Sequence, residues 1–182
     1  TLFLVVVNGI GNMLCCPCAH FFIVVLDNQF HNESYPHNML LGRIDYPLPF
    51  EIIIHKNLEC IERYAFSGLK NLKTIEVDKE NPYYRGGDTL FETREYMGDD
   101  IYFLWCSSEK TGHYEVASWI DKIGPKAFAN SKLEKVTLGE KIDYIWEDAF
   151  ENCPNLVIKA PEGSYAIEYA KENSLKFEEI TY

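Results

Sequence analysis

The residues with the most evident capacity for chemistry are the cysteines and the histidine of the stretch CCPCAH, near the start of the chain. Thiolate and imidazole groups are the usual ligands of structural zinc, so Cys15, Cys18 and His20 are candidate ligands. Such sites normally use two pairs of ligands with short gaps, and no second pair follows; His31 and His37 would have to fold back. We therefore expect no metal and no cofactor, and interpret these cysteines as small buried apolar residues.

Nucleophilic and acid–base catalysis are the next possibilities. A thiolate nucleophile at Cys60 needs a base within reach, and His55 is the nearest along the chain. The two residues are five positions apart across a corner of the repeat, and we interpret them as one exposed residue at a strand end and one spacer, not as a catalytic pair. Glu147, Asp148 and Glu151 share one short segment with no apolar pocket to shift their pKa values, so we expect solvated carboxylates. With no phosphate-binding glycine loop or serine elbow either, the sequence predicts a protein that is not an enzyme.

Composition and charge exclude further classes. The 182 residues are 47% hydrophobic and 25% charged, which is typical of a globular chain. A net charge of −11 repels phosphate backbones and anionic lipids, so we expect no nucleic acid partner. Residues 1–26 are uncharged, but glycine, asparagine and proline divide them into short apolar runs at 2–7 and 21–26. Runs of this length favour buried strands, so we expect no membrane insertion.

The elements that would position any site follow from a repeated pattern. Three segments end in Ala-Phe and share apolar first, third, seventh and tenth positions: IIIHKNLECIERYAF (52–66), YEVASWIDKIGPKAF (114–128) and VTLGEKIDYIWEDAF (136–150). This pattern predicts a strand, a second short extended piece and a turn of helix. The step of 22 residues from Phe128 to Phe150 lies within the range of leucine-rich repeats, whose stacked copies share one core. The expected core residues are Ile61, Phe66, Ile123, Phe128, Ile145, Phe150 and Cys153.

The spacing is interrupted once and ends in a different pattern. The step from Phe66 to Phe128 is 62 residues, so we expect an insertion at about 81–113, where NPYYRGGDTLFE and MGDDIYFLWC predict projecting or stacked hairpins. Its aromatic residues favour packing, with an exposed binding surface as the alternative. Residues 161–182 predict a capping helix, with the Ser164 hydroxyl at its start and Asn173 as a left-handed stop. We expect the repeats at 49–160, and a degenerate repeat or hairpin segment at 1–48.

Several of these motifs carry a resemblance to a known family. The run from Leu133 to Leu156, L-x-x-V-x-L…I-x-x-I-x-x-x-A-F-x-x-C-x-x-L, resembles the BspA-like leucine-rich repeats of bacterial surface proteins. NPYYRGGDTLF is similar to the hairpin of that family, and CPNLVIKAPEGSYAIEYAKENSLKF to its usual C-terminal end. The resemblance covers about residues 49–178. It implies a leucine-rich repeat solenoid, placed extracellularly or on the cell surface, that adheres to host or matrix proteins or to neighbouring cells.

A solenoid of this kind suggests where binding would occur. Outward residues of neighbouring strands form a ladder suited to extended ligands. The outward residues that we expect are Ile53, His55, Thr74, Glu76, Glu115, Ala117, Lys135 and Thr137. The sequence therefore favours a non-enzymatic module that binds a protein or glycan ligand, with host matrix among the candidates. The alternative is a structural or targeting segment of a larger protein whose activity lies elsewhere.

Overall fold

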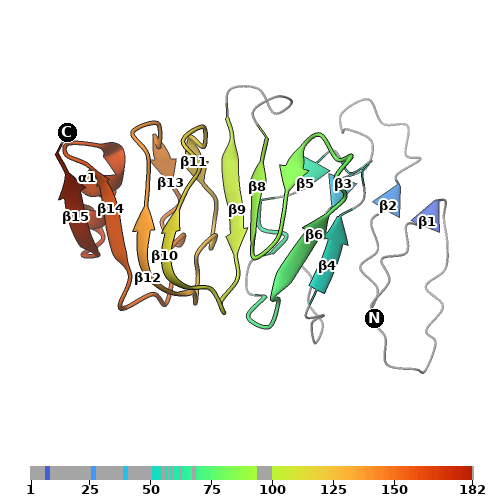
Figure 1. Ribbon diagram of the computed structural model, residues 1–182, viewed down its shortest axis with the longest axis horizontal. Helices are drawn as coiled ribbons and strands as arrows, with labels where there is room; N and C mark the ends of the chain where they lie inside the picture. Colours follow the sequence, from blue (N-terminus) through green and yellow to red (C-terminus); the bar gives the residue numbers. More distant parts are fainter. Residues whose placement is uncertain are drawn as a thin grey trace.

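The computed structural model describes residues 7–8, 26–27, 39–40, 51–54, 56, 58, 60–61, 63–66, 69–93 and 100–181. Within them the chain is an elongated solenoid of short, mostly parallel strands with one helix, α1, at its C-terminal end (Figure 1). The predicted leucine-rich repeat solenoid is thus confirmed. The candidate zinc ligands Cys15, Cys18 and His20 and the candidate base His55 lie outside the described residues.

One row of strands carries the alternating pattern. It contains β4 (Glu51–Ile54), β6 (Thr74–Val77), β10 (Thr111–Glu115), β12 (Lys132–Thr137), β14 (Val157–Pro161) and β15 (Lys176–Ile180). The last four form one parallel sheet in the order β10-β12-β14-β15, whereas β4 and β6 form a separate parallel pair. Inward residues such as Val136 and Ile158 are fully buried and lie opposite each other in the register. The alternation therefore places every second side chain in the core.

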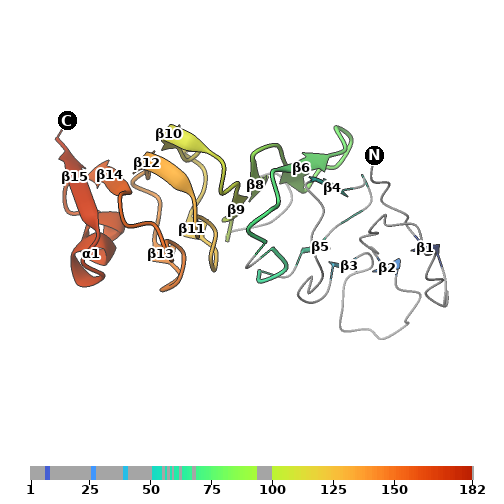
Figure 2. The same ribbon diagram turned by 90° about the horizontal axis from the view of Figure 1, so that it is seen from below.

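A second row lies on the opposite side of the stack, and Figure 2 shows the two rows along the length of the molecule. It contains β5 (Cys60–Ile61), which pairs with β3 (Met39–Leu40), together with β9 (Tyr102–Cys106), β11 (Lys122–Ile123) and β13 (Tyr144–Ile145). These last three pair in parallel, in the order β9-β11-β13. Near the N-terminus, β1 (Val7–Asn8) pairs in parallel with β2 (Leu26–Asp27).

The described strands of the insertion are stacked into the solenoid. Strands β7 (Tyr84–Arg85), β8 (Thr89–Glu92) and β9 pair antiparallel, and β9 continues into the parallel row through β11. Asn81 fixes the approach to this hairpin, because its side chain accepts the N–H groups of Tyr83 and Tyr84 and donates to the carbonyl oxygen of Leu58. Most aromatic residues of the insertion are buried here, including Tyr84, Phe103 and Trp105, so packing accounts for them.

The Ala-Phe segments are hydrogen-bonded turns, where a turn of helix was expected. In the second copy, Ala127 N–H donates to the carbonyl oxygen of Gly124, and in the third, Ala149 N–H donates to that of Trp146. Lys126 has a φ of 53° and Asn130 one of 61°, which interrupt any helix because left-handed residues do not continue a right-handed one. α1 (Tyr165–Glu172) is the single helix of the described residues.

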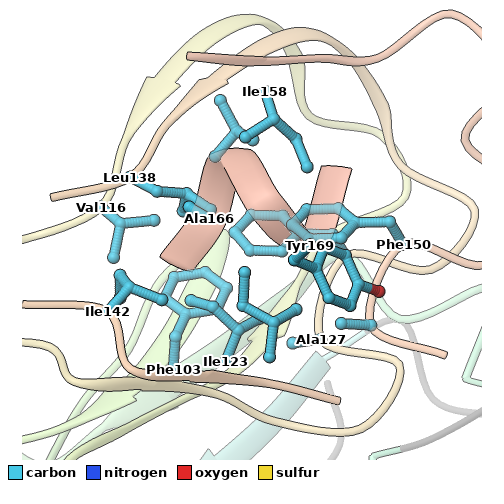
Figure 3. Close-up of a cluster of buried hydrophobic side chains, with 14 of the residues drawn as sticks. Phe103, Val116, Ile123, Ala127, Leu138, Ile142, Phe150, Ile158, Ala166 and Tyr169 are labelled. Atoms are coloured by element: carbon cyan, nitrogen blue, oxygen red, sulfur yellow. The ribbon is translucent and has the colours of Figure 1, made fainter. Parts of the chain in front are cut away.

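The turns nevertheless bring the aromatic rings together. The rings of Phe103 and Phe128 are stacked with centroids 4.5 Å apart, and those of Phe128 and Phe150 with centroids 5.2 Å apart. Figure 3 shows part of this cluster, in which the ring of Phe150 lies next to Tyr169 of α1, with centroids 6.1 Å apart. The stacked rings form the axis of the larger hydrophobic core. A second core cluster surrounds Phe66 and Leu90, and the half-buried Trp146 packs against both clusters.

Helix α1 covers the C-terminal end of the core. Its inward residues Ala166, Ile167 and Ala170 are buried, as expected. The expected cap is wrong in two details. The Ser164 hydroxyl is buried without a hydrogen-bond partner among the described residues, since Ile167 and Glu168 N–H donate to its backbone oxygen. The left-handed residue is Ser174 (φ 55°), because Asn173 (φ −92°) turns its side-chain amide back to the carbonyl oxygen of Tyr169.

Candidate functional site

The outward face of the four-stranded sheet presents two rows of side chains in register, and all of them except Val157 are polar. The first row contains His113, Lys135, Val157 and Lys176, and the second contains Glu115, Thr137, Lys159 and Glu178. We call these eight residues the ladder. Neighbouring strands lie about 4.8 Å apart, so each row spans roughly 15 Å. This is a flat, regular surface with an ordered sequence of charges.

Contacts within the ladder fix several side chains. His113 Nε2 lies 2.7 Å from the Thr137 hydroxyl oxygen. Lys135 Nζ reaches past β14 to both carboxylate oxygens of Glu178, at 2.9 and 2.7 Å. The hydrogen bond from Lys135 holds the pKa of Glu178 below its ordinary value. Strands β12 and β15 are therefore linked through an exposed ion pair that passes over β14, whereas Lys159 of β14 forms no ion pair in the described part of the chain.

The predicted outward residues divide between two surfaces. Glu115, Lys135 and Thr137 lie on the ladder, with Glu115 exposed and the other two half-buried. Ile53 and Thr74 are half-buried and Glu76 is exposed on the separate pair β4–β6, where Ile53 lies opposite Glu76. The two sheets are not joined as one row, because the hairpin of β7 and β8 occupies the interval between β6 and β10.

One outward residue was predicted wrongly and several were missed. Ala117 follows the end of β10, is half-buried and packs against the core. The missed members are His113, Val157, Lys159, Lys176 and Glu178. The alternation of apolar and polar residues along β10 and β14 would have been sufficient to predict that His113 and Lys159 face outward. Lys176 and Glu178 could not be predicted in this way, because β15 lies in the segment interpreted as the cap. Nearly all of its residues are exposed, so it lacks the alternation of buried and exposed residues that marks an outward face.

The residues predicted for the core have low exposure. Ile61, Phe66, Ile123, Phe128, Ile145, Phe150 and Cys153 are each at most 6% exposed. The Cys153 thiol donates to the carbonyl oxygen of Phe128, at 3.0 Å, and lies 3.7 Å from the Ser131 hydroxyl. Burial raises the pKa of Cys106, a second buried free thiol among the described residues, to about 12. Both thiols therefore fill space in the interior, and burial disfavours the thiolate form of Cys106.

The three candidate acid–base residues, Glu147, Asp148 and Glu151, have different surroundings and do not form one site. Glu151 forms an ion pair with Lys126 at 2.8 Å, and this contact lowers the pKa of the carboxyl group. Asp148 accepts the backbone N–H of Lys126, and Glu147 is exposed. Across the described ranges, no group of three or more histidine, cysteine or acidic residues could hold a metal ion. None of these contacts pairs a nucleophile with a base.

The arrangement defines a class of protein, a leucine-rich repeat solenoid, which is a repeat-based binding or structural module. The chain belongs to the BspA type leucine rich repeat family. Six copies of the family repeat match residues 50–93 and 100–181, which include the hairpin, the ladder and the cap.

A solved structure supports the same fold. The chain is similar to a leucine-rich repeat protein from Eubacterium ventriosum, at 21% identity and a TM-score of 0.53. The alignment covers 62% of this chain and 30% of that chain, so the likeness concerns less than a third of the larger protein. A search of curated proteins gave no match. In the part of the chain described by the structure, no helix has the length and apolar character needed to cross a membrane.

Proposed function

We propose that the chain is a non-enzymatic binding module of a bacterial cell-surface or secreted protein, and that it engages a protein ligand through the ladder. The observation that supports this proposal is the register of β10, β12, β14 and β15, which places eight outward residues in two parallel rows. Repetition at a fixed spacing suits an extended ligand with repeated features of its own. BspA-type repeats are typical of bacterial surface proteins, which favours the extracellular location.

The chemistry of the ladder favours a protein surface with mixed charge. Positive groups come from Lys159 and Lys176, and a negative group comes from Glu115. The Lys135–Glu178 pair holds two further charges in a fixed position. Complementary charge across such a surface guides encounter and fixes the register of a partner more than it adds affinity. A glycan ligand and adhesion to host matrix are narrower forms of the same proposal.

A binding array tests it. The purified chain is presented to matrix proteins, bacterial surface proteins and glycans, and each positive ligand is then titrated against the double variant Lys135→Glu, Thr137→Arg. The variant reverses one charge and places a long cation where Thr137 contacts His113, so we expect at least a tenfold loss of affinity. The matched control, Lys141→Glu with Ser118→Arg, makes the same charge changes on exposed residues outside the ladder.

If the ladder variant and the control variant both bind the ligand with the affinity of the wild type, the proposed binding surface is contradicted. That result would favour the second candidate, a structural or targeting segment of a larger protein. The specific support for this candidate is that the similar Eubacterium ventriosum chain extends well beyond the aligned region, which covers 30% of it. Fusing the segment to an unrelated reporter and following the location of the reporter tests this candidate separately.

A further inference from the structure

The last strand of the four-stranded sheet has an edge without a partner strand. β15 ends the order β10-β12-β14-β15 at one end of the molecule, and among the described residues it pairs with β14 alone (Figure 1). Four of its five residues are exposed. Phe177 lies opposite Ile158 and so faces inward, but it is 38% exposed, whereas Ile158 is fully buried. The core is therefore incompletely covered at this strand.

The hydrogen bonds to β14 determine which backbone groups of β15 face the open edge. Glu162, just after β14, donates its N–H to the carbonyl oxygen of Ile180, at 3.2 Å. The backbone groups of successive residues point to alternate sides of a strand, so those of Lys176 and Glu178 also point toward β14. The N–H and C=O groups of Phe177, between them, therefore point to the open edge. Unpaired groups of this kind form a template for another strand.

We propose that this edge pairs with the same edge of a second copy of the chain, antiparallel and centred on Phe177, so that a symmetric dimer joins the two four-stranded sheets. A two-fold axis brings the same surface of both copies together, and makes identical edges run antiparallel. The two Phe177 residues then lie opposite each other and exchange both of their backbone hydrogen bonds. The outward faces of the two sheets remain on one side, so the two ladders become continuous.

Charge selects this register. With Phe177 opposite itself, Lys176 of each copy lies opposite Glu178 of the other copy, on the outward face. A shift of two residues places Lys176 opposite Lys176 or Glu178 opposite Glu178, and like charges directly opposite each other are destabilising. A shift of one residue exchanges the inward and outward faces. Glu178 can accept a second cation, because Lys135 occupies one position on each of its oxygens and a carboxylate offers about four.

On the inward face, the pairing covers the Phe177 rings. In one copy the Lys171 ammonium group lies 5.2 Å from the centroid of this ring and forms an ion pair with Glu179, at 3.0 Å. Residues opposite each other in a hydrogen-bonded pair have Cα atoms about 5.5 Å apart, which is close enough for the two rings to meet. Each copy then loses exposed apolar area that the monomer leaves in water.

The contact involves one strand from each copy, so the dimer should be weak. Its area is smaller than the roughly 1,200 Å² of the smallest stable interfaces, and we expect a dissociation constant of about 0.1 mM. The net charge of −11 opposes the approach of a second copy. Association should therefore be measured at an ionic strength of about 0.15 M, where screening acts within about 8 Å. This inference concerns assembly and does not rest on the proposed function.

Sedimentation equilibrium of the whole chain, over concentrations that bracket the expected dissociation constant, measures the dimer. Lys176→Glu and Glu178→Lys each place like charges opposite each other at both positions, so each variant alone should associate at least tenfold more weakly than wild type. An equimolar mixture of the two variants restores opposite charges at both positions and should associate as tightly as wild type. Glu178→Lys also removes the exposed ion pair with Lys135, which contributes little to stability, and circular dichroism checks that both variants fold.

Matched controls separate this edge from general effects of charge. Lys141→Glu and Glu140→Lys make the same charge changes on exposed residues outside β15, and each should dimerise within about twofold of wild type. The proposal is overturned if wild type sediments as a monomer at every concentration, or if the single β15 variants associate as well as wild type. It is equally overturned if the mixture of the two variants remains monomeric.

Discussion

Replacing Phe128 by alanine should lower the free energy of unfolding by about 3–5 kcal/mol. The Phe128 side chain is fully buried, and its ring lies between two others: Phe103 is inclined by 4° and Phe150 by 8°. Burial of roughly 150 Å² of ring surface contributes about 4 kcal/mol at 25 cal/mol/Å². Contact with the two neighbouring rings places the expected loss toward the upper end of the 3–5 kcal/mol range. The coils on either side are held by their own hydrogen bonds, so a cavity would remain after the ring is lost.

Urea unfolding followed by circular dichroism measures this effect. Phe177→Ala is the matched control, because that ring is 38% exposed on the edge strand β15 and its loss should cost about 1 kcal/mol or less. Phe150→Ala and the double variant complete a mutant cycle, for which we expect a coupling of about 0.5–1.5 kcal/mol between the two rings. A Phe128→Ala variant as stable as the Phe177→Ala control, or a coupling of zero, would refute the shared stack.

Two further predictions concern single groups. Burial raises the pKa of Glu92 from 4.5 to about 7, although Tyr102 N–H donates to the carboxylate at 2.8 Å. The folded protein then binds more protons than the unfolded chain between these pH values, so this group lowers stability as the pH rises through the window, by about 3 kcal/mol in all. Glu92→Gln should gain stability relative to wild type between pH 4.5 and 7 in urea titrations, and a difference that does not change with pH would count against this cause. Ser164→Ala should be neutral or stabilising by up to about 1 kcal/mol in thermal melts, because its hydroxyl is buried without a partner in the described ranges; a loss of about 1 kcal/mol would instead indicate an ordinary cap.

The repeating apolar positions were sufficient to predict the fold. Equivalent residues such as Ile123 and Ile145 lie opposite each other in neighbouring strands, as expected of stacked copies. This succeeded because periodicity determines which side chains face the core, and a solenoid needs little more than that rule applied to each copy. The family resemblance drew on the same positions, and it is confirmed by the match over residues 50–93 and 100–181.

The features that were not predicted depend on contacts between copies. Nothing in one repeat indicates that β6 and β10 belong to different sheets, since this follows from the way the inserted hairpin pairs. The contact between the Tyr64 and Trp146 rings was likewise missed, because these residues are separated by more than eighty positions and occupy different places in their copies. Local backbone geometry was the third source of error. Lys126 and Ser174 have a left-handed backbone, but neither is a glycine or an asparagine, the residue types that would have indicated this conformation in the sequence.

The hairpin between β6 and β10 also has a mechanical consequence. On its C-terminal side, strands are joined by continuous rows of backbone hydrogen bonds, whereas between β6 and the hairpin the structure describes a single bridge, from Ile75 to Gly87. Tension applied along the axis would be shared by many backbone hydrogen bonds within the sheet β10-β12-β14-β15 and concentrated at the bridge between Ile75 and Gly87. The molecule should therefore part here first under load, and its larger C-terminal core would remain intact as one mechanical unit.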